Sequence, residues 1–355
     1  ILKNPARAHT LLQPMLGDKT RDKEALYLAG WAMAYQKKWR EAAKYFDRAT
    51  VIDPDYAKAY HALGDIQSLQ GDFENAMLFY EKSLERNPLH LNSAVEQARI
   101  LIEVKTELKQ GEEILALVFG KHFKSLAPSE RAKAHALRAK IHTRRHDYDK
   151  AAVDLNAAIQ LVPEKVAYLA MLGEFHLDTG QYAKALTMFE KALQLEPDNV
   201  DAMVGKGRAM WQNGDIVKAK VLLEKTLSRA AKDPRPLYLL GRIAEDLEKP
   251  EEAMTYYQKA AKVAPKFLNS RVAMARLHLK MKDLKKALDE LTSARNLNPD
   301  SAIVRNGLGE IYFKQGNFRL ARKEFEEALR LDPELASAHF NLANTMRELG
   351  ALDEA

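Results

Sequence analysis

The 355-residue chain contains no cysteine. This absence excludes disulfide bonds, thiolate metal sites and cysteine nucleophiles. Long apolar runs are also missing, because the uncharged stretch YLAGWAMAY at 27–35 is far shorter than the roughly 20 residues that a helix needs to cross a bilayer. The sequence therefore predicts no transmembrane segment.

A strong excess of either charge is missing as well. The 55 basic and 49 acidic residues leave a net charge of +6, and the basic residues are spread along the chain. A nucleic-acid-binding surface usually shows as a concentrated basic patch. We therefore do not expect nucleic acid to be the main partner.

The sequence motifs of the common catalytic sites are absent too. The chain has no GxxxxGK[ST], HExxH or GxSxG. The two glycines of GKGR at 205–208 follow no strand pattern, so a dinucleotide site is not indicated. We expect no enzymatic activity, no cofactor and no small-molecule substrate.

What the sequence does contain is a repeat of 34 residues. HLDTGQYAKALTMFEKALQLEPD at 176–198 returns as YFKQGNFRLARKEFEEALRLDPE at 312–334. A fixed period of roughly 20 to 50 residues indicates an array of stacked structural units. Every complete unit except the third has 34 residues, and the units begin at Lys23, Ala57, Leu91, Ala132, Val166, Val200, Pro234, Leu268, Ala302 and Ala336.

Small and large residues recur at fixed positions, counted from the first residue of each unit. Position 8 is glycine or alanine, position 20 is almost always alanine, position 24 is large and position 27 is small. Two antiparallel helices approach closely only where both carry small side chains, so positions 8 and 20 mark their crossing, with position 24 filling the space beside it. Glycine at position 15 and proline at position 32 end the two helices. The fold class predicted is all-α, an α-solenoid (superhelix) of stacked antiparallel helix hairpins.

This pattern resembles the tetratricopeptide repeat, and the resemblance covers nearly the whole chain. It assigns residues 1–22 to the second helix of a preceding repeat, with Ala8 at position 20. Residues 23–131 then form repeats 1 to 3, residues 132–335 form repeats 4 to 9, and residues 336–355 begin a tenth. Both ends of the sequence fall within a repeat, so we expect a longer parent array.

The third repeat is irregular. Its 41 residues, from Leu91 to the next start at Ala132, exceed the period by seven, and its position 20 is Gln110. The extra residues lie around 116–130, where a lengthened second helix followed by a loop accounts for them. The alternative is a hinge or docking site between two blocks of repeats, which predicts early proteolysis between residues 118 and 131.

Histidine occupies position 11 in three repeats, as His142, His176 and His278. His142 and His146 lie four residues apart near the end of a predicted helix, a spacing that suits a pair of metal ligands. Recurrence at one position of the repeat favours packing over metal binding, so we expect no metal site.

The resemblance implies that positions 2, 5, 9, 12 and 13 of the first helices line a concave groove; we call the surface formed by these positions the first-helix face. Arginine presents a planar fork that suits carboxylate and phosphate groups. Position 9 is basic in five repeats, and these residues form the candidate groove for a protein or peptide partner that carries acidic or anionic groups: Arg99, Lys140, Arg208, Arg242 and Arg276. The alternative is that the arginines pair with acids of the groove itself, the candidates being Asp201, Glu245 and Asp246.

A second basic region covers residues 121–150, with nine basic and three acidic residues and the run RRH at 144–146. A charge run at a helix–turn tip is usually a solvated edge. The alternative is contact with an acidic partner, a lipid headgroup or nucleic acid, which predicts a steep dependence of binding on salt.

The leading functional hypothesis is a non-catalytic scaffold for protein–protein interactions within a multiprotein assembly. The alternatives are a targeting or regulatory arm of a larger enzyme and a scaffold in polysaccharide secretion. The peptide clamp of some family members cannot be assembled here, and of the asparagine ladder of sugar-transferase arrays only Asn341 is present. The style of the repeats favours the bacterial envelope or periplasm over the cytoplasm, although the sequence does not determine the compartment.

Overall fold

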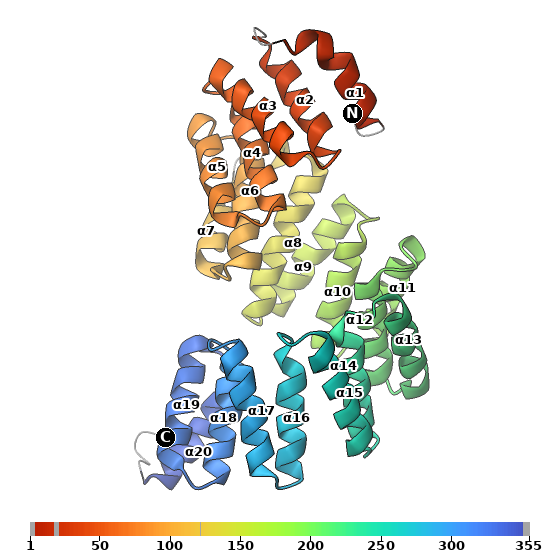
Figure 1. Ribbon diagram of the computed structural model, residues 1–355, viewed down its shortest axis with the longest axis vertical. Helices are drawn as coiled ribbons and strands as arrows, with labels where there is room; N and C mark the ends of the chain where they lie inside the picture. The colour runs from red at the N-terminus through yellow and green to blue at the C-terminus, as the bar shows by residue number, and fades with distance from the viewer. Residues whose placement is uncertain (1–3, 18–20, 121, 351–355) are drawn as a thin grey trace. The chain divides into compact units, whose positions relative to one another are not determined.

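The computed structural model describes residues 4–17, 21–120 and 122–350. Within these ranges every regular element is a helix and no strand occurs (Figure 1). The chain divides into two compact units, Ile1–Phe175 and His176–Ala355. The division falls inside one helix, and each unit is described by itself below.

The helices alternate between first and second helices of the repeats. Every predicted unit start except Ala132 is the first residue of a helix, which confirms the all-α class. The first helices are α2 (Lys23–Ala34), α4 (Ala57–Leu69), α6 (Leu91–Arg99), α8 (Pro128–Arg144), α10 (Val166–Asp178), α12 (Val200–Gln212), α14 (Pro234–Asp246), α16 (Leu268–Lys280), α18 (Ala302–Lys314) and α20 (Ala336–Glu348). The second helices are α1 (Pro5–Leu12), α3 (Trp39–Ile52), α5 (Phe73–Arg86), α7 (Leu108–Val118), α9 (Tyr148–Leu161), α11 (Tyr182–Leu195), α13 (Ile216–Arg229), α15 (Pro250–Val263), α17 (Leu284–Leu297) and α19 (Phe318–Leu331). Three short elements complete the order: η1 (Gln13–Met15), η2 (Ile100–Val104) and η3 (Phe123–Ser125).

The two helices of a hairpin meet where a glycine faces a large side chain. A Cβ atom on Gly30 would lie 2.4 Å from the ring of Phe46, and one on Gly309 would lie 2.5 Å from the ring of Phe325. The residue at position 24 therefore packs directly onto position 8 of its own repeat, rather than beside the crossing as the sequence suggested. Every aromatic ring at position 24 is matched by glycine at position 8, because a ring leaves no room for a methyl group.

The turn between the two helices requires a left-handed residue at position 15. Glycine meets this need at Gly71 (φ +82°) and Gly316 (φ +75°), as predicted. The same geometry persists where the residue is not glycine, as at Glu248 (φ +58°) and, in the irregular repeat, Thr106 (φ +58°). Because a side chain in this region costs about 1–2 kcal/mol, packing of the hairpin rather than the local residue enforces the turn.

The irregular third repeat contains a π-helix. The first helix α6 continues into η2, whose wider turn inserts one residue, and the second helix therefore starts one position late. Gly111 takes the place of the usual alanine, and a Cβ atom there would lie 2.5 Å from Ile102. The predicted lengthened second helix is wrong, because α7 has 11 residues whereas α5 has 14. The other extra residues form η3, its flanking turns and the first residues of α8.

The segment that follows α7 is folded against α8 inside the first unit. Phe119 and Phe123 stack with ring centroids 4.6 Å apart, and both rings meet the edge or face of His135. The guanidinium of Arg138 lies 3.6 Å from the centroid of Phe119 and forms two hydrogen bonds of 2.7 and 2.8 Å with Asp154. The division between the compact units lies elsewhere, within α10. Of the predicted irregular segment, residue 121 falls outside the described residues.

Candidate functional site

The predicted groove residues of the first unit are bonded to neighbouring side chains. Arg99 on α6 donates to Glu96 at 2.6 Å and to the hydroxyl of Ser68 on α4 at 2.7 Å. Lys140 on α8 forms an ion pair with Glu103. Both cations are thus engaged within the unit.

The three arginines of the second unit differ from one another. Arg208 on α12 lies 3.2 Å from Asp178. Arg242 on α14 lies 3.7 Å from Glu245, as suggested, and its guanidinium is 5.5 Å from the centroid of Trp211. Arg276 on α16 is exposed and makes no hydrogen bond or ion pair with any residue that the structure describes.

Two of the three acids proposed as partners of these arginines have other roles. Asp201 pairs with Arg235 at 2.7 Å. Asp246 accepts a hydrogen bond of 2.8 Å from the indole of Trp211. On the first-helix face of the second unit, Arg276 is therefore the position-9 cation that makes no hydrogen bond or ion pair with a described residue, and Lys314 at position 13 is a second cation in that state.

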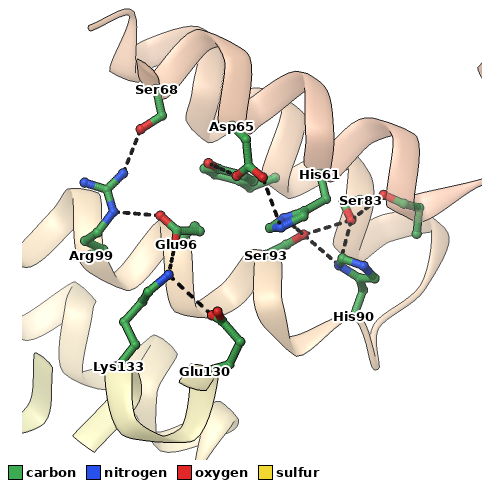
Figure 2. A network of polar contacts seen from close by, with 12 residues as sticks. His61, Asp65, Ser68, Ser83, His90, Ser93, Glu96, Arg99, Glu130 and Lys133 are labelled. Carbon is green, nitrogen blue, oxygen red and sulfur yellow. Dashed lines mark hydrogen bonds and ion pairs between the residues drawn. The ribbon is translucent and has the colours of Figure 1, made fainter. Parts of the chain in front are cut away.

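Glu96 is the centre of one half of a polar network on the first-helix face of the first unit (Figure 2). Its carboxylate accepts from Arg99 at 2.6 Å and from Lys133 on α8 at 2.5 Å, and Lys133 also lies 3.4 Å from Glu130. The Glu96 side chain is only 12% exposed. Burial by itself would raise the pKa of Glu96, but Lys133 and Arg99 hold it below its usual range. The group joins α6 to both of its neighbours.

The other half of the network runs from α4 into the interior (Figure 2). The hydroxyl of Tyr80 donates to Asp65 at 2.8 Å, and His61 Nε2 lies 3.5 Å from the second carboxyl oxygen. On its other side His61 Nδ1 lies 3.1 Å from the hydroxyl of Ser93, which donates to Ser83 at 2.9 Å. Burial raises the pKa of Asp65 to about 7 and lowers that of His61 to about 4.

The hydrogen bonds determine where the protons of this network lie. Ser83 donates to the Ala57 carbonyl, so the single proton of Ser93 goes to Ser83. His61 and His90 must then donate to Ser93 through Nδ1. The Nε2 atom of neutral His61 carries no proton, so a protonated Asp65 is the form that fits beside it.

An acid, a histidine and a serine in this order resemble a nucleophilic relay, but the geometry does not allow one. Ser93 and Ser83 have no exposed surface, and both hydroxyl protons are committed to buried acceptors. A nucleophile must reach the substrate carbonyl, and this serine cannot. The network therefore fastens α4, α5 and α6 together.

The second unit carries an open cavity of about 660 Å³ between α18 and α20. Phe313 and Phe318, whose ring centroids lie 5.3 Å apart, contribute to its wall, together with Phe340, which is 68% exposed. Most of the lining residues occupy positions 5, 9, 12 and 13, so the cavity opens on the first-helix face. The remaining residues that line it are Glu310, Lys314, Phe325, Asn341, Asn344 and Glu348.

A smaller cavity of about 130 Å³ lies between α16 and α18. Arg276 lines it, together with Leu279 and Ile303, and Glu310 lines both cavities. Between the two cavities, Glu310 accepts hydrogen bonds from the amides of Asn306 at 2.8 Å and Asn341 at 3.2 Å. The two cavities are thus separated by one helix and one set of amide contacts.

Family models of the tetratricopeptide repeat match residues 23–56, 57–88, 136–187, 177–243 and 245–311, and a TPR repeat model matches residues 309–350. Together these matches cover well over half of the chain. The chain belongs to the tetratricopeptide repeat family. A curated relative, Protein NPGR2 of Arabidopsis thaliana, is 33% identical over 66 residues, which make up 19% of this chain and 9% of that protein.

The solved structures that resemble this chain include two structures of IFIT1. The human IFIT1 dimer with m7Gppp-AAAA is 18% identical, with a TM-score of 0.56 over 92% of this chain and 76% of that one. A monomeric IFIT1 mutant with Gppp-AAAA is 19% identical, with a TM-score of 0.58 over the same shares. At this level of identity the similarity shows the fold alone.

The remaining candidate sites of the repeat array are occupied by internal contacts. In the basic region, Arg145 forms two hydrogen bonds with Glu112 on α7, at 2.7 and 2.8 Å. His142 lies 3.8 Å from the buried Asp154, and His146 bonds to the hydroxyl of Tyr148 at 2.8 Å. The described residues hold no group of three or more potential metal ligands. In the same residues no helix is both long and apolar enough to span a membrane.

Sequence reasoning missed most of the residues that line the two cavities. Asn341 stands out in the sequence only as a partial match to an asparagine ladder at position 6, and its partner Asn306 does not match that ladder because it stands at position 5. Phe340 stands at position 5, where Tyr27 and Tyr238 are also aromatic, so the repeat position by itself did not mark a cavity. The polar network of the first unit offered only scattered histidines and acids.

Proposed function

We propose that this protein is a non-catalytic scaffold whose second unit binds an extended acidic segment of a partner protein on its first-helix face. Membership of the tetratricopeptide repeat family supports a role in protein interaction in general. The observation that carries the finer proposal is Arg276, an exposed cation without a described partner, which lines an open cavity on that face.

The two units support this choice of location. In the first unit the cations Arg99 and Lys140 are already paired, so an acidic ligand would have to displace Glu96 or Glu103. In the second unit Arg208 and Arg242 are partly engaged and contribute less than Arg276. Of the three arginines that the sequence predicted as a ladder, we therefore expect Arg276 to make the principal contact with the ligand and Arg208 and Arg242 to make weaker ones.

The test is fluorescence anisotropy with a labelled octapeptide of alternating glutamate and alanine, compared with its glutamine counterpart. Arg276→Ala should weaken binding of the acidic peptide about five-fold, as expected for a partly exposed ion pair. Arg330→Ala, on the outer side of α19 and paired with Glu327, is the matched control and should bind like the parent protein. Equal binding of both peptides, or no effect of Arg276→Ala, would refute the proposal.

Two competing ligands test the other hypotheses about the partner. A 5′-triphosphorylated oligoadenylate tests RNA, which the IFIT1 structures contain, and polygalacturonate tests an anionic polysaccharide. If either binds more tightly than the acidic peptide and depends on Arg276, the partner is not a protein segment. Two further predictions stand. Cell fractionation tests a location in the bacterial envelope, and the sequence of the parent protein tests a role as an arm of a larger enzyme.

A further inference from the structure

The larger cavity of the second unit has the chemistry of a pocket for one apolar side chain. Phe313, Phe318 and Phe340 contribute to its wall, and the Phe340 side chain is 68% exposed. Covering such a ring with another apolar group removes both from water, at about 25 cal/mol for each Å². A cavity of about 660 Å³ is large enough to admit an aromatic side chain.

Polar groups beside this pocket suit the backbone of an extended segment. Asn344 and Lys314 line the cavity and have no hydrogen bond or ion pair within the described part of the chain. Asn306 and Asn341 are held in place by Glu310, so their orientation is set before any ligand arrives. Peptide N–H and C=O groups need such partners when a segment lies in a groove.

Charges fix which end of the groove receives an acid. Two acids, Glu310 and Glu348, line the larger cavity against one cation, Lys314, so the balance of charge disfavours a carboxylate there, whereas a single acid, Glu310, faces Arg276 in the smaller cavity. Arg276 lines the smaller cavity on the other side of α18 and is available. A ligand that carries both an apolar and an acidic side chain therefore has one favoured placement.

The distance between the two cavities fixes the spacing of those side chains. The cavities flank α18 and share Glu310, so their centres lie about one helix spacing apart, roughly 8–10 Å. A segment in the polyproline II conformation advances about 3.1 Å for each residue and turns its side chains to the same side every three residues, so two side chains three residues apart face both cavities.

Resting on the proposed function, we infer that the second unit binds a partner segment in which a glutamate or aspartate stands three residues from an aromatic or large aliphatic residue. The carboxylate pairs with Arg276, and the apolar side chain enters the cavity lined by Phe340. The amide of Asn341, which Asn306 and Glu310 hold in place, lies against the backbone between them. This adds a definite sequence preference to a general interaction role.

The experiment measures binding of labelled peptides to the full chain by anisotropy. The probe contains Glu-Ala-Ala-Phe, and its order is also reversed because either chain direction satisfies the geometry. Replacing the peptide phenylalanine by alanine, or Phe340 by alanine in the protein, should each weaken binding about ten-fold. The two changes together should weaken it little further, because both remove the same contact.

Controls separate this inference from the proposed function and from misfolding. Phe340→Leu should keep most of the affinity, and Val217→Ala, an exposed apolar residue on α13, should keep all of it. Peptides in which the two side chains are adjacent, or six residues apart, should bind as weakly as the alanine peptide. Circular dichroism checks that each variant folds.

Three outcomes would overturn the inference. If Phe340→Ala has no effect while Arg276→Ala and the glutamine peptide still lose affinity, the acidic groove stands and the pocket does not. If Phe340→Ala instead abolishes a concentration-dependent dimer seen by sedimentation, the occupant is a second copy of the chain. If none of the peptides binds but the triphosphorylated RNA does, the occupant is not a peptide.

Discussion

The first helices of the first unit present polar side chains that bond to one another, whereas those of the second unit leave two cavities open. In the first unit Glu96 satisfies Arg99 and Lys133, and nothing in this network lacks a partner. In the second unit Arg276 and Phe340 are exposed beside cavities. The comparison teaches that the same repeat fold can use its polar side chains in two ways. Side chains that bond to one another hold neighbouring helices together, and side chains without such a partner are available to a ligand.

What the two units share is the helix crossing, so damage there should have the largest effect in either. Gly309→Ala places a methyl group about 2.5 Å from the ring of Phe325 and should destabilise the chain by about 3 kcal/mol. Combining it with Phe325→Leu should restore part of this loss, because alanine and leucine already occupy these positions at Ala275 and Leu291. The measurement is the unfolding free energy from urea titration.

Gly316→Ala, in the turn before α19, is the control for a glycine that faces open space. It should cost about 1 kcal/mol through backbone strain alone, and Phe325→Leu should not relieve it. If the crossing and turn variants responded alike to Phe325→Leu, the account of the crossing would be wrong.

A second prediction sharpens the difference between the units. Glu96→Ala leaves Lys133 and Arg99 without their shared acceptor in a half-buried site, and should destabilise the first unit by about 2 kcal/mol. Glu310→Ala removes an acceptor from two neutral amides and should lower the free energy of unfolding by about 1 kcal/mol. It should also weaken binding of the peptide that carries the acidic and aromatic side chains. If urea titrations gave the same loss of unfolding free energy for Glu96→Ala and Glu310→Ala, the proposed difference between the two units would be wrong.

The third prediction concerns pH and acts on the first unit alone. Burial raises the pKa of Asp65 to about 7, from an ordinary value of 3.8. Stability that depends on its proton is complete below pH 3.8 and is lost as the pH rises to about 7. Asp65→Asn keeps the acceptor for Tyr80 and a donor for His61, so this variant should lose less stability than the parent protein between pH 5 and 8.

The measurement is the unfolding free energy at several pH values, with exposed Asp289→Asn in the second unit as the control. His61 and His90 act in the opposite sense, because burial lowers the pKa of each to about 4. Their contribution is present above pH 6.5 and is lost as the pH falls toward 4 in both proteins. A variant whose stability fell as steeply as the parent's above pH 5 would show that Asp65 is ionised in the fold.

Much of the fold was predictable from single residues. Position 8 glycines, position 20 alanines and the turn glycines gave helix starts that the structure reproduces at all unit starts but Ala132. The irregular repeat was predicted at the right place but with the wrong structure, because a π-helix has no distinct residue signature. In the sequence, the residue that the π-helix inserts shows only as a shift of the small residue from position 20, which is Gln110, to the next position, which is Gly111.

The candidate site was less predictable. Position 9 pointed to the right face, but the pairing of each cation depends on long side chains that reach across to other helices, as Lys133 reaches Glu96 over 37 residues of sequence. The cavity at Phe340 depends on what neighbouring side chains fail to fill. Neither property is encoded in a repeat position.

The sequence by itself determined that this protein is a row of helical hairpins, because small and large residues at a 34-residue period leave helices only one close way to cross. The tertiary structure alone decided which charges are consumed and which remain, because an ion pair forms between side chains that folding brings within about 4 Å, whatever their distance along the chain.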